Sequence, residues 1–322
     1  MDFAVFTICA IAIAAAGTLL VDAVDAVGER TGIGHVFLGG VLLAGATSLP
    51  EVVSVTSAGA LGEADLAIGT VLGSNLFNMA IFGTVALTAP LAIRPSPAGQ
   101  RAGYAAVVLG TAVLIFLFVD EPTLGQLGLG SVVLIALYGL SAFVLFRHDR
   151  LAQLGQEKRS RNTNSQTVTR AAEAAPPETH RFYSVSHSLR AAIGVLLICS
   201  VVVFVAAVAL ADAADGIARE LNVTGGVVGV VGVAFATSLP EVVTSIAALR
   251  KGAPGLVVGN AFGSNLFNLA VIFPSDIAFD RGALIDAAQS EQVVTAAFGL
   301  LLMGLAIFAL SDHGQHDAIG HK

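Results

Sequence analysis

Long apolar blocks separated by short polar segments run along the whole chain. Five of these blocks are nearly free of charge, and each is close to the ~20 residues that cross a bilayer as a helix. They cover residues 5–21, 105–119, 132–146, 195–211 and 293–310. With weaker apolar stretches they predict about nine transmembrane helices, at 3–25, 36–60, 65–90, 103–119, 127–146, 190–211, 227–249, 255–273 and 293–311. We therefore expect an all-α polytopic membrane protein.

The composition agrees with this class. Hydrophobic residues make up 55% of the chain and charged residues 12%, whereas a soluble domain usually carries about 25% charged residues. Both cysteines, Cys9 and Cys199, lie inside apolar blocks, and two are too few for a disulfide framework. The lipid bilayer is the expected partner, no nucleic-acid partner is expected, and the oligomeric state stays open.

Charged residues segregate between alternate loops. One set of loops holds Arg30, Arg94, Arg101, Arg250 and Lys251, with the polar segment 147–189. The other set holds Glu63, Asp65, Asp120, Glu121, Glu220, Asp276, Asp280, Asp286 and Glu291. Because basic loops stay in the cytoplasm, the N-terminus is expected outside and the C-terminus inside a multi-pass cell-membrane protein.

The segment 147–189 divides the chain into two parts. It is polar, lacks apolar periodicity and contains Pro176 and Pro177, so we expect a disordered cytoplasmic linker. The predicted organisation is a first repeat of five helices (1–146), this linker, a second repeat of four helices (190–311) and a cytoplasmic tail (312–322).

The chain repeats itself at an offset of 190 residues. The segment VLLAGATSLPEVV (41–53) returns as VGVAFATSLPEVV (231–243), and GTVLGSNLFNMA (69–80) returns as GNAFGSNLFNLA (259–270). Five predicted spans precede the linker, so the second copy begins on the opposite side of the membrane from the first. Inverted repeats are typical of secondary transporters, whose site lies near the midplane at the repeat interface.

The first repeated motif places a proline and a glutamate inside a membrane span. Pro50 and Pro240 lack a backbone N–H, so they interrupt their helices and free carbonyl groups. Helical spacing predicts that Thr47 shares a face with Glu51, and Thr237 with Glu241; Ser48 and Ser238 add hydroxyls beside the break. A carboxylate at this depth costs at least ~2.5–3.5 kcal/mol. The matched pair Glu51 and Glu241 therefore predicts a bound cation or proton.

The second motif adds hydroxyl and amide oxygens. Ser74 and Asn78 are four residues apart, as are Ser264 and Asn268, so each pair shares a helix face. Asn75 and Asn265 lie off that face, and helix packing is the alternative role for them. An all-oxygen ligand set favours hard cations such as Ca²⁺ and Na⁺ over zinc, copper or iron.

The paired ATSLPE and GSNLFN motifs resemble the alpha repeats of the calcium/cation antiporter superfamily, most closely its prokaryotic sodium/calcium exchanger branch. The resemblance implies ten helices around four cation positions. The fifth helix of the first half would map beyond Lys322, so the tenth helix is expected to be absent. Asn268 stands where some members place an Asp, which argues against potassium co-transport.

The resemblance also assigns ligands to this sequence. It implies that Glu51, Glu241, Thr47 and Thr237 hold Ca²⁺, and that Asn78 and Asn268 line the middle of the site. It implies one flanking Na⁺ site from Ser48, Ser74 and the Ala44 carbonyl, and another from Ser238, Ser264 and the Ala234 carbonyl.

The expected function is exchange of Ca²⁺ for Na⁺ by alternating access, without a cofactor. A proton-driven Ca²⁺ antiporter is the alternative, because a buried Glu can carry a proton in place of sodium. A membrane enzyme fits less well, since no nucleophile–base arrangement lies in the spans. A cation channel would fit the ligands but not the expectation that a filled site controls the movement.

Overall fold

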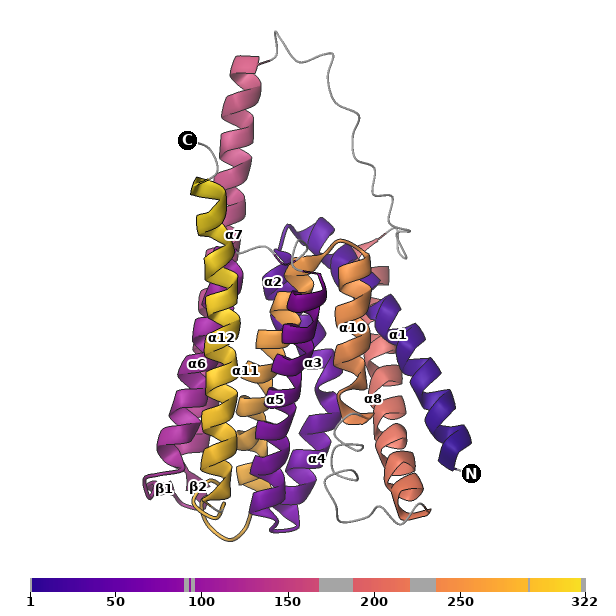
Figure 1. Ribbon diagram of the computed structural model, residues 1–322, viewed down its shortest axis with the longest axis vertical. Coiled ribbons are helices and arrows are strands. Elements are labelled where there is room, and N and C mark those ends of the chain that lie inside the picture. The colour runs from indigo at the N-terminus through magenta and orange to yellow at the C-terminus, as the bar shows by residue number, and fades with distance from the viewer. Residues whose placement is uncertain are drawn as a thin grey trace.

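The computed structural model describes residues 2–89, 93, 96–167, 188–220, 236–288 and 290–319. Helices dominate it (Figure 1). They are α1 (Asp2–Thr31), α2 (His35–Leu38), the π-helix η1 (Gly39–Leu43), α3 (Ala44–Thr47), α4 (Leu49–Ala60), α5 (Ala64–Thr88), α6 (Pro97–Phe116), α7 (Leu129–Thr167), α8 (Leu189–Glu220), α10 (Leu239–Arg250), α11 (Pro254–Ala278) and α12 (Glu291–Ile319). A short antiparallel hairpin, β1 (Thr123–Leu124) with β2 (Leu127–Gly128), joins α6 to α7.

The predicted class, an all-helical membrane protein, is confirmed. Within the described residues, seven helices are long and apolar enough to span a membrane, and the pair His35–Thr47 and Leu49–Ala60, bent by 54°, raises the number to as many as eight. These correspond to eight of the nine predicted spans. The ninth, 227–249, is described only from residue 236, because residues 221–235 lie outside the described part of the chain.

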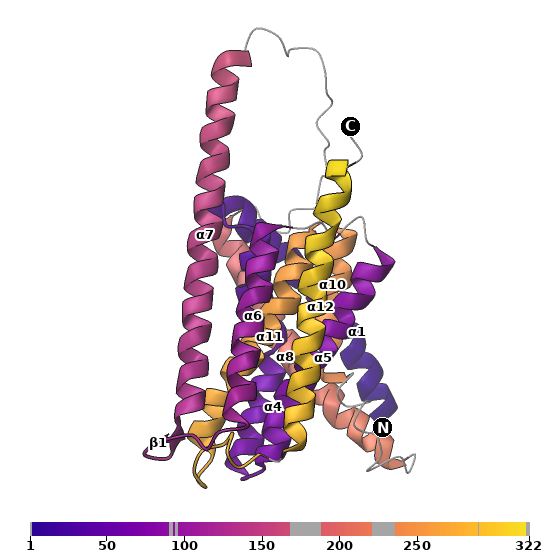
Figure 2. The same ribbon diagram turned by 60° about the vertical axis from the view of Figure 1, so that its left-hand side comes forward.

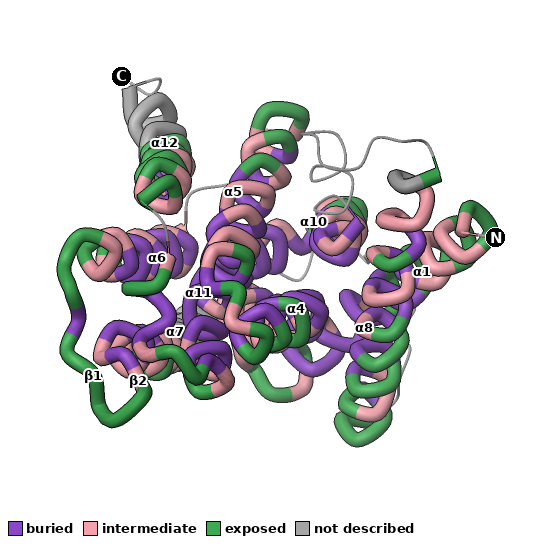
Figure 3. The backbone as a smooth tube through the Cα atoms, turned by 90° about the horizontal axis from the view of Figure 1, so that it is seen from below, coloured by how far each residue is buried: buried purple, intermediate pink, exposed green. Residues whose placement is uncertain are grey.

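Helix α11 forms the centre of the bundle. It packs against α4, α5, α6, α7 and η1. In its most apolar 18-residue stretch, 89% of the residues are buried. Viewed along the bundle, α1 and α8 lie side by side at one edge, away from α6, α7 and α12 (Figure 3). Their outward faces carry apolar side chains such as Ile8, Val201 and Val205, as expected for helices that face lipid.

The loops segregate by charge at the two ends of the bundle. The upper end in Figure 1 holds the α1–α2 and α10–α11 loops, with Arg30, Arg250 and Lys251 at or beside them; we call it the basic end. The lower end holds the α4–α5, α6–α7 and α11–α12 loops. These contain Glu63, Asp120, Glu121, Asp280 and Asp286, and we call it the acidic end.

Helix α7 differs from the expectation for the linker. It continues without a break to Thr167 and projects beyond the bundle at the basic end (Figure 2). The prediction of disorder is therefore wrong for residues 147–167, while 168–187 lie outside the described residues. Residues 147–167 contain no proline and are rich in Leu, Ala, Gln, Glu, Lys and Arg, which have high helix propensity even without an apolar stripe.

The helical hairpins α4–α5 and α10–α11 close in the same way. Gly62 (φ +77°) and Gly252 (φ +67°) follow their helices in the left-handed conformation. Each N–H donates to a carbonyl three residues back, of Gly59 and Leu249 respectively. A side chain would strain either position. The identical closure follows the 190-residue offset of the sequence repeat.

Acidic side chains join two loops at the acidic end. The Glu121 N–H lies 3.2 Å from both carboxylate oxygens of Asp286. The Asp276 carboxylate accepts from the N–H groups of Gly128 and Leu284, each at 2.8 Å, and from the Ser131 hydroxyl at 2.5 Å. The β-hairpin before α7 is therefore fixed to the α11–α12 loop.

Candidate cation site

The helix breaks that create the site occur at equivalent serines. Ser48 (φ −90°, ψ 11°) separates α3 from α4, and Ser238 (φ −91°, ψ 6°) precedes α10. Pro50 and Pro240 then lie in the first turn of the new helix, where a missing N–H leaves no hydrogen bond unmade. Each proline therefore starts a helix and does not kink a continuous one.

This break changes the expected relation of Thr47 to Glu51. The prediction that one helical turn holds both residues is wrong, because Thr47 ends α3 and Glu51 lies in the first turn of α4. The Thr47 hydroxyl donates to the carbonyls of Leu43 (3.1 Å) and Ala44 (3.3 Å). It also interacts with the Glu241 carboxylate of the other repeat.

The two glutamates are deeply buried and lack cationic partners. Glu51 and Glu241 are each 3% exposed, and they lie within electrostatic range of each other. Their Oε2 atoms have no hydrogen-bond partner among the described residues. No Lys or Arg of the described chain forms an ion pair with either one. Unpaired buried carboxylates are costly, so the arrangement favours a bound positive charge.

Serine from the first repeat reaches the glutamate of the second. The Ser48 hydroxyl donates to Glu241 Oε1 at 3.2 Å. Elements separated by 193 residues therefore meet at one site, as expected when a site lies at a repeat interface.

Four asparagines link α5 to α11. Asn78 Nδ2 donates to Asn265 Oδ1 at 3.1 Å, and Asn268 Nδ2 donates to Asn75 Oδ1 at 3.2 Å. Asn75 Nδ2 also lies 3.4 Å from the Asn265 carbonyl. Asn75 and Asn265, which are not among the predicted ligands, thus orient the amides of two that are, Asn78 and Asn268. The signal was available, because both belong to the repeated GSN motif.

Most of the remaining predicted ligands are buried. Ala44, Ser74, Ser238 and Ser264 are buried, and Ser264 Oγ has no hydrogen-bond partner in the described chain. Thr237 is partly buried. The Ala234 carbonyl lies outside the described residues.

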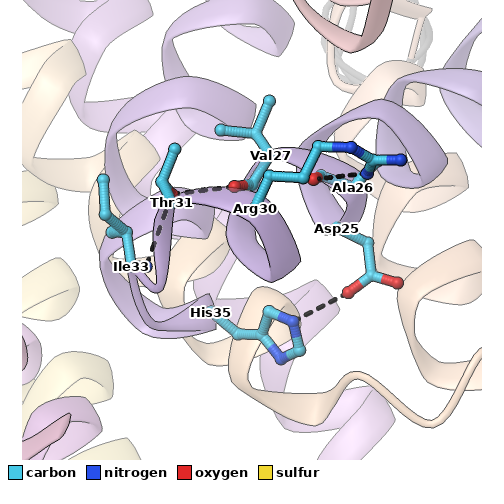
Figure 4. A network of polar contacts seen from close by, with 7 residues as sticks. All are labelled: Asp25, Ala26, Val27, Arg30, Thr31, Ile33 and His35. Carbon is cyan, nitrogen blue, oxygen red and sulfur yellow. Dashed lines mark hydrogen bonds and ion pairs between the residues drawn. The ribbon is translucent and has the colours of Figure 1, made fainter. Parts of the chain in front are cut away.

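The basic end fixes α1 to the core. The Asp25 Oδ1 atom lies 2.8 Å from His35 Nε2 (Figure 4), and Asp22 pairs with Lys251 in the α10–α11 loop. Burial lowers the pKa of Lys251. The Arg30 guanidinium bonds back to the Ala26 carbonyl at 2.9 Å. Helix α1 is therefore joined to two core elements by charged contacts, in addition to its apolar packing on α8.

The donor set suits hard cations. Within the described ranges, no three His, Cys, Asp or Glu side chains converge on one point, so a soft-metal centre has no ligands there. The site instead combines two carboxylates with hydroxyl and amide oxygens, which are the ligands of Ca²⁺ and similar cations.

Comparison with known proteins agrees with this chemistry. The family model described as "Sodium/calcium exchanger protein" matches residues 1–147 and 191–314. The inner membrane protein YrbG of Escherichia coli is 28% identical over 292 residues, which cover 90% of this chain and 82% of YrbG. The sodium/calcium exchanger MaX1 of Methanosarcina acetivorans is 25% identical over 280 residues, covering 78% and 75% of the two chains.

The fold is also shared with a solved exchanger. The sodium-calcium exchanger NCX_Mj, in a structure soaked with Na⁺ and Sr²⁺, superposes with a TM-score of 0.69 at 21% identity. The superposition covers 100% of this chain and 98% of that one. With its buried carboxylate pair and the family match along both halves, the chain belongs to the sodium/calcium exchanger family and is a membrane cation antiporter, not an enzyme.

Proposed function

We propose that the protein exchanges Ca²⁺ for Na⁺ across the cell membrane by alternating access. The observation that supports this most strongly is the pair Glu51 and Glu241, which are buried, within electrostatic range of each other and without a cationic partner in the described chain. Two carboxylates neutralise one Ca²⁺, and Ca²⁺ takes 6–8 oxygens at ~2.3–2.6 Å. Thr47 and Thr237 are proposed to complete this central position.

Sodium is proposed to occupy the flanking positions. Ser48, Ser74 and the Ala44 carbonyl would hold one ion, and Ser238, Ser264 and the Ala234 carbonyl the other. Asn78 and Asn268 line the middle of the site. These neutral oxygens suit a monovalent cation, and a Na⁺ that shares the Glu oxygens would compete directly with Ca²⁺. The alternative is that protons on Glu51 and Glu241 replace sodium.

The arrangement of α1 and α8 supports alternating access. The two helices pack on each other at the edge of the bundle, and α1 also packs on α10 beside the site. We propose that they slide against the core when the site is filled. The Asp22–Lys251 and Asp25–His35 contacts would then break and form again during the cycle.

The charge segregation supports an orientation with the N-terminus outside and the C-terminus in the cytoplasm. It follows that the two halves, 1–146 and 190–311, are inverted repeats. A cysteine introduced at exposed Gln126 on the acidic end should react with a membrane-impermeant maleimide in intact cells. A cysteine at exposed Glu29 on the basic end should react only after permeabilisation. The reverse pattern would refute this orientation.

The exchange is tested by ⁴⁵Ca²⁺ uptake into proteoliposomes loaded with Na⁺. We expect uptake that requires the sodium gradient and is lost in both Glu51→Gln and Glu241→Gln. Glu63→Gln, which changes an exposed acid outside the site, is the matched control and should retain uptake.

Other results of the uptake experiment would distinguish sodium exchange from the alternative functions. Uptake that follows a pH step without sodium would establish the proton-driven alternative. Flux independent of any counter-ion would indicate a channel. Full activity in either Gln variant would remove the carboxylate pair as the site.

A further inference from the structure

The polar face of α11 continues beyond the proposed site toward the basic end. Asn260, Ser264 and Asn268 are spaced four residues apart and so share one helix face. All three are at most 1% exposed. Asn260 belongs to none of the proposed Ca²⁺ or Na⁺ positions, yet it is as deeply buried as the residues that do.

A contact between α10 and α11 fixes the depth of Asn260. Asn260 Nδ2 lies 3.4 Å from Thr244 Oγ1, and the two helices form an antiparallel hairpin that closes at Gly252. With a rise of about 1.5 Å per residue, Ser264 lies about 6 Å deeper than Asn260, and Glu241 about 4.5 Å deeper than Thr244. Ser264 and Glu241 thus share one layer, with Asn260 and Thr244 one turn closer to the basic end.

The Asn260 side chain presents an acceptor oxygen with no partner. Its amide N–H is directed to Thr244, whose hydroxyl donates to the Pro240 carbonyl at 2.8 Å. Asn260 Oδ1 has no hydrogen-bond partner in the described chain, and the same holds for Ser264 Oγ and Glu241 Oε2. Leaving a buried amide oxygen unsatisfied is costly, and a cation at this oxygen would remove that cost.

The first repeat lacks this feature. At the offset of 190, Thr70 and Ser54 stand where Asn260 and Thr244 are. The half-buried Thr70 donates its hydroxyl to the Leu66 carbonyl of its own helix at 2.7 Å, in a hydrogen bond that is itself exposed. Ser54 is exposed. The additional oxygen therefore exists on one side of the site only.

We propose that Asn260 Oδ1 and Ser264 Oγ, the latter shared with the flanking Na⁺ position, form a further binding position for a monovalent cation of Na⁺ size, between the layer of Glu241 and the layer one helical turn closer to the basic end. The inference rests on the proposed exchange. The position would be one through which Na⁺ enters or leaves the site from the basic end. Both ligands are neutral oxygens, and Ca²⁺ is bound mainly through carboxylates, so the position favours the monovalent ion. Its absence from the first repeat makes the two faces of the exchanger unequal toward Na⁺.

The test is the Na⁺ dependence of ⁴⁵Ca²⁺ exchange, measured separately at each membrane face with inside-out and right-side-out vesicles. We expect Asn260→Ala to raise the half-maximal Na⁺ concentration at the basic end about fivefold, without a change at the acidic end. Asn260→Asp keeps an oxygen at this position and should preserve or improve Na⁺ affinity there. Thr70→Ala is the matched control and should alter neither face.

Several results would overturn the inference. These are unchanged Na⁺ affinity in Asn260→Ala, an equal loss at both faces, or the same loss in Asn260→Asp as in Asn260→Ala, which would indicate a structural role. If Asn260→Ala does not reach the membrane, Asn260→Thr replaces it, because the first repeat already carries Thr at this point. A wild-type protein without Na⁺ dependence at either face would instead overturn the proposed sodium coupling, and this inference with it.

Discussion

At the scale of single residues, the site depends on contacts between the two repeats. Ser48 and Thr47 reach Glu241 from the first repeat, and the asparagine pairs cross from α5 to α11 in both directions. A ligand set assembled in this way responds to the relative position of the repeats. Any sliding of one repeat on the other alters the number of oxygens around the ion.

The Ser48 hydroxyl gives the first prediction. Ser48→Ala removes the 3.2 Å hydrogen bond to Glu241 Oε1, and a hydrogen bond to a charged group is worth about 1.5–3 kcal/mol. We expect the apparent affinity for Ca²⁺ to fall at least about tenfold, measured as the concentration dependence of ⁴⁵Ca²⁺ uptake. Ser54→Ala, at an exposed position of the same helix, is the control. Equal affinities in the two variants would contradict a role for Ser48.

At the scale of helices, close backbone contact positions the broken span against α11. A Cβ atom at Gly263 would meet the backbone of Gly40, and one at Gly259 would meet the Val36 carbonyl. Small residues permit this approach between membrane helices. The π-helical turn Gly39–Leu43 lies at this contact, just before the Thr47 and Ser48 ligands.

The second prediction follows from this packing. Gly263→Ala places a methyl group against backbone atoms that no side-chain rotation can move away. We expect the free energy of unfolding to fall by about 1–3 kcal/mol, which would be measured as a lower melting temperature in detergent. Gly304→Ala on α12 is the control, because a Cβ there meets nothing within 4 Å. A Gly263→Ala protein as stable as this control would show that the helices can separate at little cost.

At the scale of the whole molecule, opposite ends of the bundle are held by different chemistry. The Asp22–Lys251 ion pair and the Asp25–His35 contact fix α1 at the basic end, and acidic side chains join the β-hairpin to the α11–α12 loop at the acidic end. The pKa of Glu121 is raised to about 7, mainly by burial; the N–H of Gly130 opposes this rise, and the neighbouring Asp286 and Asp276 contribute to it. Burial also raises the pKa of Asp286.

The third prediction concerns pH. Because the folded protein holds the Glu121 pKa above its unfolded value, folding favours the protonated form. The stability that this provides is fully present below about pH 4.5 and is lost as the pH rises through about 7. We expect the melting temperature to fall between about pH 5 and about pH 8, and Glu121→Gln to flatten that slope. Glu63→Gln, exposed at the same end, should retain the wild-type slope; a slope unchanged in Glu121→Gln would assign the titration elsewhere.

The sequence by itself determined the membrane class and the position of most spans, and it predicted the residues of the proposed site. Hydrophobic length fixes where helices can cross, since backbone groups in lipid must be satisfied within the segment. The repeated ATSLPE and GSNLFN motifs marked the buried glutamates because an unpaired carboxylate at that depth needs a cation.

Only the tertiary structure decided which oxygens face one another. Helical periodicity predicted that Thr47 shares a helix face with Glu51. In the structure the helix breaks at Ser48, and the Thr47 side chain interacts with Glu241 of the other repeat. The hydrogen bonds of Asn75 with Asn268 and of Glu121 with Asp286 join positions far apart in the chain. The unpartnered oxygen of Asn260 lies where α11 contacts the adjacent helix α10. Spacing along one helix carries no information about such contacts, because the depth and rotation of the neighbouring helix determine them.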